Sequence, residues 1–317
     1  MASILVFGAT GVAGKYIIDA LVARKSSFSR LGIFTSQNTV DKKAELIQRL
    51  KSEGIHVHVG HVGKEEDVLA AYQDYDTVVN AAGRNAILSQ IDLLRLAEQT
   101  QNIKRFFPSE YGTDIEYSPA SANEKPHQLK LKVRAYIKEH VKRVQYTYVV
   151  TGPYAEMALS RMPPAIEAAG SFDVHGKKAI LLGSGDEPVS YTTMPDLGSL
   201  VVAALLHPEE ARDRALKVNS FTATGHQVLA EFEKQTGGKW IVSYTSLDEL
   251  KEMETEAWEK GEPFATVFTL RRIWTEGGTL YKGRDNGVIE YRDTEALATL
   301  VRRIIRTQTG EHAEGKM

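Results

Sequence analysis

The segment that decides the fold reads Ile4-Leu-Val-Phe-Gly-Ala-Thr-Gly-Val-Ala-Gly14, a short apolar run followed by three evenly spaced glycines. The apolar run predicts a buried strand, and residues 15–23, with apolar side chains at helical spacing, predict the helix after it. Glycines at such a junction let the backbone turn tightly and approach a pyrophosphate, to which the helix N-terminus offers free N–H groups. We therefore expect a dinucleotide-binding turn. Its expected contacts are Gly8, Thr10, Gly11, Val12 and Gly14.

Strand and helix patterns alternate through the rest of the first half. Strands are expected at 31–34, 55–59, 76–80, 105–108 and 145–150, and helices at 41–52, 65–72, 87–98 and 126–140. This alternation predicts an α/β fold, a Rossmann-type doubly wound parallel sheet. The alternative is a glycine-rich turn in an unrelated α/β protein. The repeated strand–helix units argue against it.

The pattern is looser in the second half, where we expect a hairpin at 172–182 and helices at 196–206 and 247–260. We expect a dinucleotide-binding Rossmann domain at 1–152. Residues 153–317 should form mainly a smaller α/β substrate-binding domain, part of which returns to the Rossmann sheet. The cleft should lie between them, at the carboxyl ends of the strands. The polar tail at 307–317 should be frayed.

Composition excludes several classes of function. The 317 residues include no cysteine, which excludes disulfides, thiolate metal sites and cysteine nucleophiles. A net charge of -2 gives no sign of a nucleic-acid or anionic-membrane partner. The N-terminus has no secretory pattern, and no apolar run approaches the ~18 residues of a membrane span. We expect a cytoplasmic protein.

The end of the second strand distinguishes NAD from NADP. A carboxylate there would bind the ribose 2′-OH and repel a 2′-phosphate. This chain instead reads Phe34-Thr-Ser-Gln-Asn38, with no carboxylate before Asp41, and Lys42 and Lys43 follow. We therefore predict NADP(H) as the cofactor. Its 2′-phosphate side should contact Thr35, Ser36 and Lys43, although a solvated loop with two surface lysines would look similar.

The chemistry differs from that of classical short-chain dehydrogenases, in which a lysine four residues after a tyrosine lowers the tyrosine pKa. None of the 13 tyrosines has such a lysine. The run Asn80-Ala-Ala-Gly83 nevertheless matches the cofactor loop of that superfamily. We therefore expect Ala81, Ala82 and Gly83 at the cofactor.

The run Lys104-Arg-Phe-Phe-Pro-Ser-Glu-Tyr-Gly112 resembles the isoflavone reductase family, whose usual form has Phe in place of Tyr. That family includes phenylcoumaran benzylic ether reductases and pinoresinol–lariciresinol reductases, within the NmrA-like branch of atypical short-chain reductases. The resemblance covers residues 3 to about 250, and little matches between 250 and 286. It implies an NADPH-dependent reductase of a small aromatic or phenolic metabolite.

The resemblance also implies a catalytic lysine, acting as general acid or base, at Lys130, which would lie beside the cofactor too. By periodicity alone, Leu129, Val133 and Ile137 form an apolar stripe, and Lys130 lies at its rim. A lysine there can bury its stem and reach a pocket, whereas the alternative is a basic solvated helix face. Lys132 is the rival if the register shifts by two.

The resemblance further implies cofactor contacts, one of which departs from the family. Its usual arginine at the end of the second strand corresponds to Thr35, and a following lysine corresponds to Lys43. Phe107 would pack on the cofactor, or equally would be a core residue that ends the fifth strand. The substrate wall is expected to include Tyr154, Met157, Met162 and Tyr191, with plain core as the alternative.

Two other clusters are interpreted as structural. His56 and His58 share a strand face near His61, but without carboxylates we expect a partly exposed strand edge and no metal site. Ser109 and Glu110 lack the Gly-x-Ser-x-Gly context of a hydrolase, so Glu110 should fasten its loop.

The expected ligands are NADP(H) and a small aromatic molecule, with no nucleic acid and no membrane, and a homodimer is left open. The rival interpretation is an NmrA-like regulator that senses NADP(H) without turnover. A lysine at position 130 favours the enzyme, because a pure sensor has no use for it.

Overall fold

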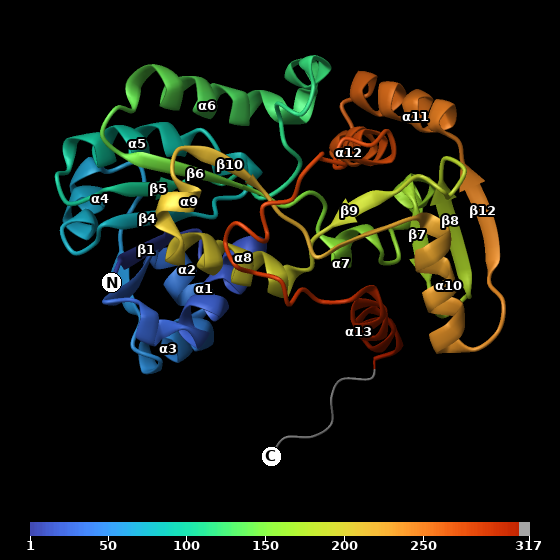
Figure 1. Cartoon of the computed structure of the whole chain (residues 1–317), viewed down its shortest axis with the longest axis horizontal. Coiled ribbons are helices and arrows are strands. Elements are labelled where there is room, and N and C mark those ends of the chain that lie inside the picture. The colour runs from blue at the N-terminus through green and yellow to red at the C-terminus, as the bar shows by residue number, and fades with distance from the viewer. Residues whose placement is uncertain (311–317) are drawn as a thin grey trace.

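A parallel sheet of seven strands forms the centre of the first lobe in the computed structural model, which describes residues 1–310 (Figure 1). The strands are β1 (Ser3–Phe7), β2 (Arg30–Thr35), β3 (His56–Val59), β4 (Thr77–Asn80), β5 (Arg105–Phe107), β6 (Gln145–Val150) and β10 (Arg214–Lys217). Their order is β10-β6-β5-β4-β1-β2-β3, and every neighbouring pair is parallel. The strand order therefore reverses beside β1, where doubly wound sheets bind their ligands.

Helices cover both faces of this sheet. One face carries α1 (Val12–Ala23), α2 (Gln37–Lys42), α3 (Ala44–Ser52), α8 (Met194–Leu206) and α9 (Pro208–Ala211); the other carries α4 (Glu65–Tyr72), α5 (Ser89–Gln99) and α6 (Gln128–His140). Strand β1 is buried on both sides, because Ile4 and Val6 pack into one core and Leu5 and Phe7 into the other. This explains why β1 is a continuous apolar run rather than an alternating one.

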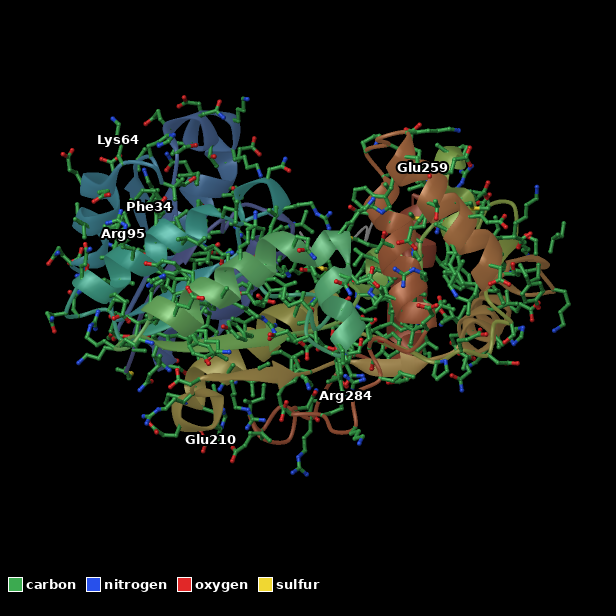
Figure 2. All side chains as sticks on the ribbon, turned by 90° about the horizontal axis from the view of Figure 1, so that it is seen from above. Phe34, Lys64, Arg95, Glu210, Glu259 and Arg284 are labelled. Carbon is green, nitrogen blue, oxygen red and sulfur yellow. The ribbon has the colours of Figure 1, made fainter. Side chains whose placement is uncertain are left out.

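The second lobe holds two small sheets and most of the later helices. Its strands are β7 (Ser171–Asp173), β8 (Lys178–Leu182), β9 (Val189–Tyr191), β11 (Phe221–Ala223) and β12 (Ile241–Thr245). Its helices are α7 (Ala155–Ala158), α10 (Gly225–Thr236), α11 (Leu247–Glu259), α12 (Ala265–Thr275) and α13 (Leu297–Thr309). The rings of Phe172 and Phe232 stack with centroids 5.1 Å apart and join the β7–β8 hairpin to α10. Figure 2 shows the lobes from above, with Phe34 and Arg95 in the first and Glu259 in the second.

Short 3-10 turns complete the chain. They are η1 (Lys25–Ser27), η2 (Arg84–Ala86), η3 (Pro119–Asn123), η4 (Lys125–His127) and η5 (Pro164–Ala169). The segment with η3 and η4 extends from the first lobe toward α12. Turn η4 contacts α12, and Figure 1 shows the segment beside this helix.

The predicted fold class is confirmed, and the structure corrects details of the predicted elements. The single helix expected at 41–52 is two helices, since Lys43 has non-helical dihedrals (φ -127°, ψ 38°) between α2 and α3. Helix α8 and strand β10, although late in the sequence, pack on or pair with the first sheet. Helix α13 continues to Thr309, whereas the rest of the tail expected to fray, residues 311–317, lies outside the described residues.

Within residues 1–310, no helix is both long enough and apolar enough to cross a bilayer.

Candidate active site

The glycine turn between β1 and α1 closes tightly against the end of β4. Gly8 has a φ of +73°, and a Cβ there would lie 2.6 Å from the carbonyl oxygen of Ala81. A Cβ on Gly14 would lie 2.0 Å from the Gly8 carbonyl oxygen, and the Gly11 N–H donates to that same oxygen over 2.9 Å. Only glycine fits positions 8 and 14, because any side chain there would overlap backbone atoms.

The N-terminus of α1 is open to an anion. No side chain caps it, and its first turn has no acidic residue. Gly11 and Val12 at this end are exposed. The free N–H groups and the positive end of the helix dipole there are the features that bind phosphate in dinucleotide folds.

Lys43 lies against this turn, although it is 33 residues away from it in the sequence. Its ammonium donates a 2.6 Å hydrogen bond to the carbonyl oxygen of Thr10. The break between α2 and α3 gives Lys43 this position. The structure thus brings together Lys43 and the predicted phosphate turn.

The end of β2 offers few free polar groups. Thr35 is buried, and the Ser36 hydroxyl accepts a hydrogen bond from the Thr39 N–H and caps α2. Lys42 is exposed on the last turn of α2. Lys42 and Lys43 are the cationic side chains in residues 36–43, and of the two it is Lys43 that contacts the glycine turn.

The loops after β4 and β5 are tied together beside the turn. The Ala82 N–H donates to Asn80 Oδ1 over 2.8 Å, and the Ser109 hydroxyl donates to the Ala82 carbonyl oxygen over 2.9 Å. Gly83 follows as the residue that precedes η2. Phe107 is only 1% exposed and belongs to the core that includes Val6 and Val79, so its ring presents no open face to a cofactor. Of the two roles considered for Phe107, this burial favours that of a core residue at the end of β5.

Glu110 fastens the loop after β5, as the sequence led us to expect. Its carboxylate, 1% exposed, receives Nη2 and Nε of Arg134 at 3.1 and 3.3 Å. Arg134 also contacts Asp114 at 3.4 Å and Glu116 at 2.5 Å. These carboxylates hold the pKa of Arg134 above its ordinary value despite its burial. The network fixes α6 to the loop and thereby sets the position of the side chain one turn earlier, Lys130.

Lys130 lies on α6 at the rim of the buried face, where the apolar stripe of Val133 and Ile137 predicted it. A Cβ on Gly112 would lie 3.7 Å from its Nζ, so the ammonium sits against the loop after β5. Burial lowers the pKa of Lys130, Glu110 opposes this effect, and the charges of Arg134 and Arg84 add to the lowering. Its rival Lys132 is exposed on another side of the helix.

Lys130 lines a cavity of about 300 Å³ between the two lobes. The walls are mostly apolar and come from the loop after β5, from α7 and from α12. Of the four residues expected in the substrate wall, Tyr154, Met157 and Met162 line this cavity, whereas Tyr191 lines a smaller adjoining cavity of about 50 Å³. The cavity has the composition of a small-molecule site, apolar with a few polar groups.

Sequence reasoning missed several polar groups in this cavity. They are Arg84, Tyr111, His127, Arg271 and Trp274. The hydroxyl of Tyr111 and Nε2 of His127 are buried without a hydrogen-bond partner in the described part of the chain. Arg84 directly follows the Asn80–Gly83 run and His127 precedes Lys130 by three residues, so both lay beside predicted sites. Arg271 and Trp274 lie in the stretch 250–286, where the sequence shows little of the family resemblance.

The histidines on β3 lie on the edge strand of the sheet, and His58 Nε2 lies 2.9 Å from the Tyr75 hydroxyl. Among the residues that the structure describes, no group of three or more histidine or carboxylate side chains is arranged so that it could hold a metal ion.

The known proteins most similar to this chain include reductases, by sequence and by structure. The chain is 27% identical to isoflavone reductase from Pisum sativum over 268 residues, which is 80% of this chain and 82% of the relative. It is 28% identical to oxidoreductase aprR from Aspergillus flavus over 315 residues, 95% of each chain. Among solved structures, leucoanthocyanidin reductase from Vitis vinifera, in a binary complex with NADPH, superimposes with a TM-score of 0.80 at 18% identity. That match covers 96% of this chain and 99% of the other and shows a common fold.

The sequence model of the NmrA-like family matches residues 1–269, most of the chain. The resemblance found in residues 104–112 is therefore confirmed at the level of the family. From its glycine turn, its parallel sheet and this match, the chain belongs to the NmrA-like family.

Proposed function

We propose that this chain is an NADPH-dependent reductase of a small aromatic or conjugated substrate, with Lys130 as its general acid or base. One observation carries the proposal: a lysine with a lowered pKa lines an apolar cavity at the end of the sheet that bears the glycine turn. Relatives named isoflavone reductase and oxidoreductase, and a solved neighbour in complex with NADPH, support it.

The residues around the glycine turn fit a dinucleotide. Gly11 and Val12 at the uncapped start of α1 would hold the pyrophosphate, and the absence of side chains at Gly8 and Gly14 lets the turn close beneath it. Lys43 and Ser36 would face the 2′-phosphate, and Ala81 to Gly83 would line the path toward the cavity. When bound, NADPH supplies a hydride from nicotinamide C4.

Lys130 would exchange a proton with a phenol, enol or carbonyl oxygen of the substrate. Burial brings the pKa of an ammonium closer to neutrality, which is what proton transfer at physiological pH requires. In the described residues no hydrogen bond or ion pair engages Nζ of Lys130, so the group is available to a substrate. Glu110 and Arg134 act only indirectly, by fixing α6.

The two lobes would divide the work. We infer that residues 1–152, joined by α8 and β10, hold the cofactor, and that the later segments around α7 and α12 hold the substrate. The cavity between them then excludes water from the reacting atoms. Pro153 and Tyr154, which follow the last strand of the first half, belong to the cavity wall.

The test is NADPH oxidation, followed by absorbance, across a library of phenols, conjugated carbonyls and quinones. Lys130→Ala should lower kcat by about 10²–10⁴-fold and leave the Kd for NADPH nearly unchanged. Lys132→Ala is the matched control and should be nearly silent, because its side chain is exposed on another side of the helix. Loss of activity in Lys132→Ala instead of Lys130→Ala would mean that the catalytic lysine lies two residues later on the helix.

The rival function is a regulator that binds NADP(H) without turnover. It predicts tight NADPH binding, no substrate-dependent oxidation with any member of the library, and no effect of Lys130→Ala on binding. That set of results would replace the reductase proposal.

A further inference from the structure

The cavity beside Lys130 is positively charged. Three cationic side chains line it, Arg84, Lys130 and Arg271, and none of its lining residues within positions 1–310 is acidic. Arg84 is exposed and donates to Thr266 Oγ1 over 2.6 Å, so water screens its charge. Lys130 feels the nearby carboxylate of Glu110. Arg271, on α12, is buried and has no carboxylate beside it in the described residues.

Arg271 is 6% exposed, and the only hydrogen bond of its guanidinium in the described residues runs from Nη1 to the Ala158 carbonyl oxygen, at 2.8 Å. A guanidinium has five N–H donors, so most of them remain available. No carboxylate of residues 1–310 forms an ion pair with it. Burial lowers the pKa of Arg271 to about 10, which leaves the group charged at neutral pH.

The next residue shows that this isolation is specific. Arg272 donates to Glu124 at 2.7 Å, to Glu254 at 2.5 Å and to Glu276 at 3.0 Å. Arg272 therefore carries the structural ion pairs that join α12 to α11 and to the segment before α6. Since buried charges in proteins are normally paired, the unpaired charge of Arg271 indicates a partner supplied from outside the chain.

The groups around Arg271 describe the rest of that partner. The Trp274 ring lies 5.5 Å from its guanidinium carbon, and Met162, Val267 and Leu270 add apolar walls. A flat, apolar body would fill this space. Lys130 lies in the wall of the same cavity, on α6.

We infer that the cavity takes an aromatic or conjugated carboxylic acid, with the carboxylate on Arg271 and the apolar body directed toward Lys130. The inference rests on the proposed function for the reaction, but the binding itself does not depend on turnover. A guanidinium and a carboxylate can form a bidentate pair with two parallel hydrogen bonds, and a site of low dielectric constant strengthens these bonds. Arg271 would thus select acids over the neutral phenols that fill the same volume.

The competing explanation is that Arg271 is a purely structural residue that holds the end of α7 through Ala158. This role uses a single donor and leaves the charge without a counterion. It predicts no preference for an acid over its neutral ester.

Isothermal titration calorimetry with 4-hydroxycinnamate and its methyl ester tests the inference, with the chain both free and saturated with NADP⁺. Wild type should bind the acid roughly tenfold or more tightly than the ester. Arg271→Met should abolish this preference and change the affinity for the ester little, and Arg271→Lys should retain part of it. Arg302→Met, at an exposed position of α13, controls for overall charge and should behave as wild type.

A second variant covers the case in which Arg271→Met does not fold. Met157 is 59% exposed and lines the cavity together with Arg271, so Met157→Glu adds a carboxylate to the wall that the two residues share without disturbing the core. Met157→Glu should weaken binding of the acid selectively, and Met157→Gln should not. Equal affinities of wild type for acid and ester, or a preference that survives Arg271→Met or Met157→Glu, would overturn the inference.

The outcomes also separate this inference from the proposed function. If the chain prefers the acid in an Arg271-dependent way but never oxidises NADPH, the inferred acid site stands and the proposed reductase function is wrong. If the chain oxidises NADPH with neutral substrates and shows no preference for the acid, the reductase function stands and the inferred acid site is wrong.

Discussion

Arg134 on α6 holds both carboxylate oxygens of Glu110, with N–O distances of 3.1 and 3.3 Å, and both side chains are more than nine-tenths buried. This pair fixes the loop after β5 to the helix that carries Lys130, so the position of the proposed acid–base group depends on it.

Glu110→Gln should therefore lower the free energy of unfolding by about 3 kcal/mol, the lower end of the range for breaking a buried ion pair, because Asp114 and Glu116 remain beside Arg134. Urea denaturation measures the change. Glu139→Gln, at an exposed position of α6, should change stability by less than about 0.5 kcal/mol. Similar stabilities of the two variants would mean that the pair contributes no net stability.

Gly11→Val should prevent binding of NADPH while the chain still folds. A Cβ at position 11 would lie 3.2 Å from the Gly8 carbonyl oxygen, a contact that a small shift relieves, but the branched side chain would occupy the space in front of the α1 N–H groups. Gly14→Val should instead unfold the lobe, since a Cβ there would lie 2.0 Å from the same oxygen. Fluorescence titration and thermal unfolding distinguish these effects. Normal NADPH binding by Gly11→Val would move the phosphate site elsewhere.

The position of Lys43 predicts a preference for NADPH over NADH. Lys43→Ala should weaken NADPH binding by roughly tenfold and NADH binding much less, because only NADPH carries the 2′-phosphate. Lys42→Ala, the neighbouring exposed lysine, is the matched control and should have the smaller effect. Equal losses for the two cofactors after Lys43→Ala would place this lysine on the pyrophosphate. Equal affinities of the wild type for NADPH and NADH would contradict the preference itself. The lack of the family's usual arginine at Thr35 would then be the explanation.

Burial of Lys130 predicts a pH-dependent cost to stability. Its pKa in the folded chain is lower than the ordinary value of 10.5, so the protonated ammonium destabilises the fold. The penalty is complete below the folded pKa and disappears as pH rises from that value to the ordinary one. Lys130→Met should therefore melt at a higher temperature than wild type near pH 7, and the difference should shrink as pH increases toward 10.5. Thermal unfolding across that range tests it, with Lys132→Met as control. A difference that is constant with pH would assign the effect to packing instead.

Much of the fold could be predicted because its determinants are local in the sequence. The apolar run at Ile4 to Phe7, the glycines after it and the alternation of strand and helix patterns specify the parallel sheet. The register of Lys130 also follows from local periodicity, since Val133 and Ile137 mark the buried side of α6. Lys43 was identified as basic and close to the strand end, but its contact with Thr10 requires a helix break that periodicity did not indicate.

The sequence by itself determined the glycine turn, the alternation of strands with helices that predicts the sheet, and the helix face that carries Lys130, because each of these patterns is read from residues close together in the sequence. Only the tertiary structure decided which cations remain unpaired. Arg271 and Arg272 are adjacent and look alike in the sequence, yet Arg272 forms an ion pair with Glu124, 148 residues away. Within residues 1–310, the hydrogen bond of the Arg271 guanidinium goes to a backbone carbonyl, 113 residues away. Helical geometry points neighbouring residues about 100° apart, and the packing of α12 between the lobes gives one of them carboxylates and the other a cavity.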